Sequence, residues 1–93
     1  MTEELKRDIN VAILTELTHK DIFPRGRTAA HLQRRFRYEL DATVEQFAEC
    51  CRGLVAEKLL TILDADRLGP GTDLIYAATD EGKKFARARG LCS

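Results

Sequence analysis

Apolar residues recur at spacings of three and four along much of the chain, which is the pattern of amphipathic helices. The pattern is clearest in the middle of the sequence, where it predicts a helix over 42–57. The apolar stripe of this helix consists of Val44, Phe47, Cys51, Leu54 and Val55. Thr43 with Gln46 three residues later has the form of a capping box, which marks the helix start.

Two further helices are predicted before this one. The first covers 2–20 and ends before Pro24 and Gly26. The second covers 28–38, with Thr28 as a good N-cap residue. Their inward positions are Leu5, Ile9, Ala12, Ile13 and Leu17, then Ala29, Leu32 and Phe36. Val11 and Leu14 fall off the first stripe and indicate either a wider buried face or the surface of a partner.

The pattern changes after the helix over 42–57. A compact apolar run, LLTIL, predicts a strand over 59–63, and alternating residues predict a second strand over 73–78. The loop between them contains two glycines and a proline, which favour turns. Thr79 then caps a last, short helix over 79–89.

This order of elements predicts an α+β fold, a winged helix-turn-helix over residues 1–93. It has three helices, a β-hairpin wing and a short C-terminal helix. Inward residues of four elements are expected to meet in a single core: Phe36, Phe47, Leu54, Ile62 and Phe85.

Composition limits the possible classes of protein. The 93 residues are 44% hydrophobic and 32% charged, and no apolar run approaches the ~20 residues that span a bilayer. The charged N-terminal stretch has no apolar region of the signal-peptide kind, so we expect a cytoplasmic protein. The net charge of zero does not by itself predict a strong nucleic-acid binder.

The distribution of charge is more informative than the total. Residues 25–37 contain five arginines and no acid: Arg25, Arg27, Arg34, Arg35 and Arg37. One interpretation is a patch that contacts phosphates, since arginines and helix N-termini both favour phosphate. The other is a solvated helix face whose arginines pair with Glu39, Asp41 or Glu45.

The helix over 42–57 occupies the position of a recognition helix, but its outward side is more acidic than basic. Its outward residues are Glu45, Gln46, Glu49, Arg52, Gly53 and Glu57. A glutamate can accept a hydrogen bond from cytosine, yet three carboxylates near phosphates weaken attraction at every sequence. The candidates for contacts with base edges are Thr43, Gln46 and Arg52. Arg67, in the predicted wing, is the candidate for a minor groove.

Catalytic and metal-binding patterns are weak in this sequence. Cys50 and Cys51 are adjacent and lie on or beside the apolar stripe, where thiols behave as small hydrophobic groups. We expect them to be reduced and structurally passive rather than redox-active or metal-binding. The two histidines, His19 and His31, have no metal-ligand spacing, and no glycine-rich phosphate loop is present. The sequence therefore predicts no enzyme, no metal and no cofactor.

The end of the second predicted strand carries a family resemblance. The run Tyr76-Ala77-Ala78-Thr79-Asp80-Glu81-Gly82-Lys83 resembles the Thr-x-x-Gly helix start of MarR-like and PadR-like winged-helix regulators. Ala78 stands where the family usually has Leu, and Lys58 stands where it usually has Gly. The resemblance implies a small transcriptional regulator that binds double-stranded DNA.

Two functions therefore remain open. The first is a winged-helix DNA-binding regulator, in which Arg25, Arg27 and Arg34 hold phosphates. The second is a protein-interaction module that keeps the fold and lacks DNA binding. The neutral charge and the acidic third helix favour the second, whereas the resemblance and the arginine cluster favour the first. A homodimer or a protein partner is compatible with both.

Overall fold

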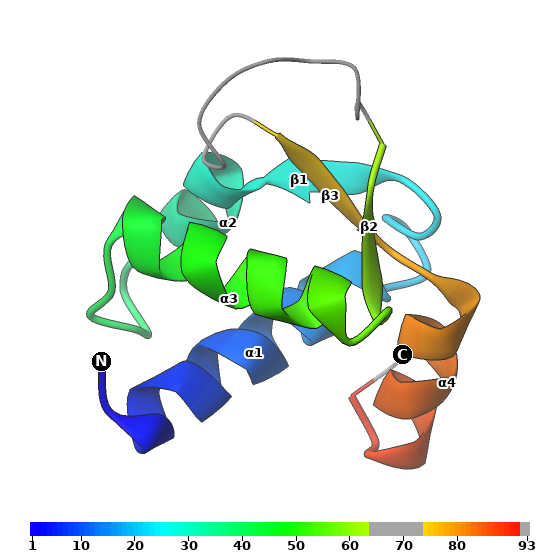
Figure 1. Ribbon diagram of the computed structural model, residues 1–93, viewed down its shortest axis with the longest axis horizontal. Coiled ribbons are helices and arrows are strands. Elements are labelled where there is room, and N and C mark those ends of the chain that lie inside the picture. The colour runs from blue at the N-terminus through cyan, green and yellow to red at the C-terminus, as the bar shows by residue number, and fades with distance from the viewer. Residues whose placement is uncertain (64–73, 92–93) are drawn as a thin grey trace.

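Four helices and three short strands form the described part of the chain, residues 1–63 and 74–91 of the computed structural model (Figure 1). In chain order they are α1 (Glu3–Leu17), β1 (Gly26–Thr28), α2 (Ala29–Arg35), α3 (Val44–Ala56), β2 (Leu60–Ile62), β3 (Ile75–Ala78) and α4 (Asp80–Ala88). The protein is therefore a compact α+β domain. None of the helices in the described part is long and apolar enough to cross a membrane.

The three strands form one antiparallel sheet in the order β1-β3-β2. The prediction of a two-stranded hairpin was incomplete, because β1 lies in the segment taken as a link between helices. Its three residues, Gly-Arg-Thr, have no apolar alternation, so pairing with β3 rather than local pattern makes this strand. Gly26 allows the close approach, since a Cβ there would overlap the carbonyl oxygen of Tyr76.

The observed helices are shorter than the predicted ranges 2–20, 28–38, 42–57 and 79–89. All four helices begin later than predicted for the same reason: the residue before each helix is a threonine that caps the helix and is not itself helical. The strands are also shorter than 59–63 and 73–78. The loop between them, including Arg67, lies outside the described residues.

Each threonine hydroxyl accepts a hydrogen bond from the main-chain N–H three residues later, at 2.9–3.1 Å. The four pairs are Thr2 with Leu5, Thr28 with His31, Thr43 with Gln46, and Thr79 with Gly82. At α3 the Gln46 Oε1 atom also accepts from the Thr43 N–H at 2.9 Å, so the predicted capping box is confirmed. Such a cap contributes about 1 kcal/mol to helix stability.

One core joins α1, α2, α3 and the sheet. Phe47 is 1% exposed, and Leu54 is 3% exposed. Phe36, Ile62 and Phe85 are half-buried and pack against this core, so the predicted shared core is confirmed. Of the two residues off the α1 stripe, Leu14 is buried and widens the inner face, whereas Val11 is 41% exposed.

The start of α4 is fixed to the main chain between α3 and β2. The Thr79 hydroxyl donates to the carbonyl oxygen of Lys58 at 2.7 Å, and the Thr79 N–H donates to that of Leu59 at 3.1 Å. A Cβ on Gly82 would overlap the Leu59 carbonyl oxygen. Lys58 itself has a φ of 67°, in the left-handed region that favours glycine. These contacts explain physically why threonine and glycine stand three residues apart here.

Lys83 belongs to a helix with several exposed bases but is not itself fully solvated. Its side chain is half-buried, and its Nζ donates to the carbonyl oxygen of Thr18 at 3.2 Å. The same ammonium group lies 4.6 Å from the centre of the Phe23 ring. Lys83 thus ties α4 to the end of α1, a contact between residues too far apart in the chain for helical periodicity to reveal.

Two glycine-to-alanine substitutions should have opposite effects on stability. Gly82→Ala should lower the free energy of unfolding by about 1–3 kcal/mol, because the new Cβ has no room beside the Leu59 carbonyl. Gly53→Ala, on the exposed side of α3 with nothing within 4 Å, should raise it by about 1 kcal/mol. Urea unfolding of both variants measures the two free energies of unfolding. Equal effects would contradict the close approach of Gly82 to the Leu59 carbonyl.

Lys58→Gly should stabilise the protein by about 0.5–1 kcal/mol, because glycine relieves the left-handed strain and keeps the carbonyl that Thr79 uses. Lys84→Gly, in the regular part of α4, is the matched control and should cost about 1 kcal/mol. Urea midpoints compare the two, and a loss of stability in Lys58→Gly would show that no strain is present at this position.

Candidate nucleic-acid interface

The predicted basic cluster is spread across the molecule, because β1 runs from a turn on the side of α4 to α2 on the side of the α2–α3 link (Figure 1). Arg25 stands in the turn before β1, Arg27 on β1, Arg34 in the last turn of α2, and Arg37 in the link between α2 and α3 (Figure 1). Arg27 is half-buried, and the other three are exposed. The link and α4 lie at opposite ends of the molecule in Figure 1, so the bases of α4 are remote from those of the link.

The first two of these arginines also bind nearby main-chain oxygens. The Arg25 Nη2 atom donates to the carbonyl oxygen of Asp21 at 2.7 Å, and the Arg27 Nη1 atom donates to that of Gly26 at 2.9 Å. A guanidinium group has five N–H donors, so each arginine keeps donors for a phosphate. These local bonds restrict the side chains without neutralising their charge.

The predicted pairing of the arginines with Glu39, Asp41 or Glu45 is not what the structure has. Among the described residues, the arginine ion pair within 4.0 Å joins Arg35 Nε to Glu16 Oε2, at 3.7 Å. This contact joins the end of α2 to the last turn of α1, which sequence neighbourhood could not indicate. The Arg35 side chain is 56% exposed, so the pair adds little to stability.

The outward side of α3 is acidic, as its sequence indicated. Glu45, Glu49 and Glu57 are exposed, and Arg52 is the exposed base among them. Of the other predicted base-contacting residues, Thr43 and Gln46 use their side-chain oxygens to cap α3. Their hydroxyl proton and amide N–H groups remain for other contacts, but the two side chains are held against the helix end.

Tyr38 is the most exposed large side chain of this region, and sequence analysis missed it. The residue is 86% exposed. The Arg37 guanidinium lies 4.7 Å from the centre of its ring and donates from Nη2 to its hydroxyl at 2.8 Å. A signal was present in the sequence RRFRYEL, where Phe36 and Leu40 take inward positions four residues apart. Tyr38 lies midway between them and therefore faces outward.

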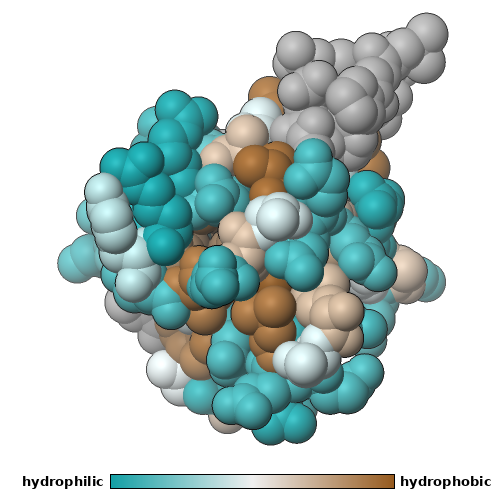
Figure 2. Space-filling model, turned by 90° about the vertical axis from the view of Figure 1, so that its left-hand side faces the viewer, coloured by the Kyte–Doolittle hydropathy of each residue, from teal (hydrophilic) through white to brown (hydrophobic). Residues whose placement is uncertain are grey.

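The side of the molecule that carries the α2–α3 link is strongly hydrophilic along one edge. Figure 2 faces this side, and apolar side chains are exposed near its centre between hydrophilic ones. One apolar hollow on α1 encloses about 400 Å³ and is lined by Val11, Phe36 and Leu40. Tyr38 does not line it, so the exposed ring and the apolar hollow are separate features.

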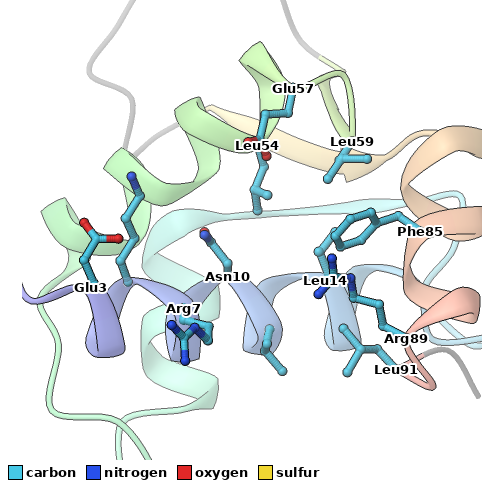
Figure 3. Close-up of a pocket in the computed structure, with 12 residues that line it drawn as sticks. Glu3, Arg7, Asn10, Leu14, Leu54, Glu57, Leu59, Phe85, Arg89 and Leu91 are labelled. Atoms are coloured by element: carbon cyan, nitrogen blue, oxygen red, sulfur yellow. The ribbon is translucent and has the colours of Figure 1, made fainter.

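A second hollow, of about 280 Å³, lies between α1, the end of α3 and α4 (Figure 3). Its apolar lining includes Leu14, Leu54, Phe85 and Leu91, and Val11 borders it as well. Asn10 projects between α1 and α3, and within the described residues its Oδ1 atom has no hydrogen-bond partner. Val11 is thus an exposed apolar ridge with a hollow on either side.

The buried cysteines are poorly suited to chemistry. Burial, with a further contribution from Cys50, raises the pKa of the Cys51 thiol to about 12. Burial also raises the pKa of Cys50, and Glu49 adds to the effect. Both thiols are therefore protonated at neutral pH, whereas a nucleophile or metal ligand needs the thiolate. Residues 1–63 and 74–91 contain no group of three His, Cys, Asp or Glu side chains placed to hold a metal ion.

Comparisons of the chain with protein families, with curated proteins and with solved structures gave no match. The function is therefore argued from the charge, exposure and geometry of the chain's own residues.

Stability should fall in alkaline solution because of these thiols. Below pH 9 both states keep the Cys51 proton; above the ordinary thiol pKa of 9.0 the unfolded chain loses it, and the folded chain keeps it until about 12. The free energy of unfolding should drop by up to about 1.4 kcal/mol per pH unit for this thiol within that window. Urea midpoints against pH measure the fall, which Cys51→Ala should make shallower. If Cys51→Ala leaves the pH dependence of the urea midpoint unchanged, the folded protein does not hold the Cys51 proton more tightly than the unfolded chain.

Proposed function

We propose that the chain is a winged-helix domain that binds double-stranded DNA as a small transcriptional regulator. The observation that carries the proposal is the order of elements together with the strand order β1-β3-β2. A helix pair, α2 and α3, is followed directly by a hairpin, and β1 joins the hairpin from the segment before α2. This arrangement is compatible with the winged-helix resemblance at Thr79 and Gly82 and supports the proposal.

The helix pair supports DNA contact through its geometry. α3 packs its apolar stripe against the core and leaves the opposite side exposed from Glu45 to Glu57. The capping box holds the first turn of α3 in a fixed shape at the end of the link. A rigid helix with one free side is what insertion into a major groove requires.

The charges determine how such a domain would dock. Three exposed carboxylates on α3 repel phosphates, whereas Arg25, Arg27 and Arg34 attract them from the neighbouring edge. Phosphate contacts fix the position of a protein on DNA, and base contacts give specificity. We therefore assign the main phosphate contacts to the edge formed by the turn before β1, β1 and α2. Arg52, Thr43 and Gln46 remain the candidates for base edges, and Arg67 remains the candidate in the loop outside the described residues.

A protein-interaction module is the second candidate function, and two observations favour it. The chain has no net charge, and its α3 face is acidic. The Val11 ridge between two apolar hollows offers a surface that a protein partner or a second copy could cover. DNA binding measured at a defined salt concentration separates this candidate from the first.

Replacing Arg25, Arg27 and Arg34 together by Gln should weaken binding to all duplex sequences. The slope of log K against log salt should flatten by roughly 0.9 for each phosphate that the variant no longer binds. Lys6, Lys84 and Arg87 are exposed bases of α1 and α4, and replacing them by Gln is the control with the same change in charge. Fluorescence anisotropy with random duplex DNA measures both. An equal weakening in the two triple variants would contradict docking through the β1–α2 edge.

Glu45→Gln with Glu49→Gln should tighten non-specific binding, because two exposed charges that repel phosphates are removed. Glu3→Gln with Glu81→Gln changes the net charge equally on α1 and α4 and is the control. Anisotropy titrations at several salt concentrations measure the difference. If the folded wild type binds no duplex at about 150 mM salt, the protein-interaction module becomes the better account.

A further inference from the structure

Tyr38 occupies an unusual environment for an exposed aromatic residue. Its neighbours in the chain are charged, and Arg34, Arg35 and Arg37 are all exposed. The other exposed large apolar residues of the described part, Met1, Val11 and Leu63, belong to other elements. Tyr38 itself does not line the apolar hollow that Val11 forms with Phe36 and Leu40.

The Arg37 guanidinium lies over the hydroxyl end of the Tyr38 ring. The distance of 4.7 Å to the ring centre and the 2.8 Å bond to the hydroxyl hold the two groups together. Because Tyr38 is nevertheless 86% exposed, one face of the ring is open to solvent. The pair is thus a flat, positively charged stack with one free π surface.

An exposed aromatic ring beside an arginine favours a particular kind of ligand. A nucleobase can stack on the open ring face, while its phosphates approach the exposed arginines that precede Tyr38 in the chain. Bases inside a duplex are stacked on one another and present only their edges, so a base in the interior of a duplex cannot lie on Tyr38. The exposed carboxylates of α3 repel the phosphates of a duplex and weaken its binding. A contact with an unpaired base would therefore add a larger share of the total affinity. Glu39, beside Tyr38, and Glu16, which pairs with Arg35, reduce the positive charge without removing it.

We propose that the open face of the Arg37–Tyr38 stack binds an unpaired nucleobase, so that the protein prefers DNA with a single-stranded extension to blunt duplex. The inference rests on the proposed DNA binding and adds to it a second structural class of substrate. It assigns the duplex to the β1–α2 edge and the unpaired base to the link that follows α2.

The test compares three probes of the same sequence: a blunt duplex, the same duplex with a thymidine overhang, and the overhang strand alone. The overhang should tighten binding, and Tyr38→Ala should remove that gain while leaving blunt-duplex affinity unchanged. The expected loss on the overhang probe is roughly 5- to 150-fold, the range for one stacked base. Tyr38→Phe keeps the ring and should keep most of the gain. Since Tyr38 is exposed, both variants should melt at the wild-type temperature.

Intrinsic fluorescence gives a direct readout, because the chain has no tryptophan and only two tyrosines, Tyr38 and Tyr76. Tyr76 is buried, and Tyr76→Phe removes its signal. In that variant the overhang probe should quench the remaining emission, as stacking on Tyr38 requires, and the blunt duplex should quench it less.

The outcomes separate the two proposals. If blunt duplex binds and the overhang gives no gain, or the gain survives in Tyr38→Ala, the stacking inference is overturned and the proposed function stands. If only the single-stranded probes bind, with loss in Tyr38→Ala, the inference is supported and the duplex-binding regulator is not. If the overhang probe does not bind, the inference fails. It also fails if Tyr38→Ala changes only self-association in light scattering without DNA, because the ring is then a protein contact.

Discussion

The main chain at Lys58 and Leu59 is the point on which the arrangement of the domain depends. The two carbonyl oxygens there receive the hydroxyl and N–H of Thr79, and Gly82 leaves room for the second of them. This contact turns the chain from α3 into β2 and places α4 beside the end of α1, where Lys83 reaches Thr18. It also fixes the open end of the hairpin, because β2 begins and β3 ends at this junction. The contacts of Thr79 and Gly82 with this main chain thus connect the helix pair, the sheet and the last helix.

The fold gives a neutral chain two surfaces of opposite charge. α3 exposes carboxylates, whereas the turn before β1 and α2 expose arginines, and the Arg27 side chain of β1 is half-buried. Overall charge would place this protein outside the usual nucleic-acid binders, but docking depends on the local field within about 10 Å, the range over which salt leaves charges unscreened. The same segregation places Tyr38 and Arg37 at the end of the basic edge rather than on α3. The basic edge, and not the helix in the recognition position, is therefore the centre of the proposed function.

Much of the fold followed from sequence because its signals are local. Periodic apolar residues located the four helices, and threonines before three of them were recognisable as caps. The features that sequence missed depend on contacts between distant residues. β1 exists because β3 pairs with it, Arg35 meets Glu16 because α2 packs near α1, and the Lys83 ammonium finds Thr18 only after α4 is in place. Tyr38 was within reach of periodicity, since its outward direction follows from the inward positions of Phe36 and Leu40. The candidate site was predicted as a set of residues, but their geometry was not.

The most direct test of a binding edge formed by the turn before β1, β1 and α2 is a titration of the isotope-labelled protein with blunt duplex DNA, followed by the amide signals in NMR spectra. The account predicts that the largest shift changes fall on residues 25–35, with smaller changes along the exposed side of α3. They should weaken as salt is added, because phosphate contacts dominate. Changes confined to α1 and α4 around Val11, or changes centred on Glu45 to Glu57 with residues 25–35 unaffected, would contradict it.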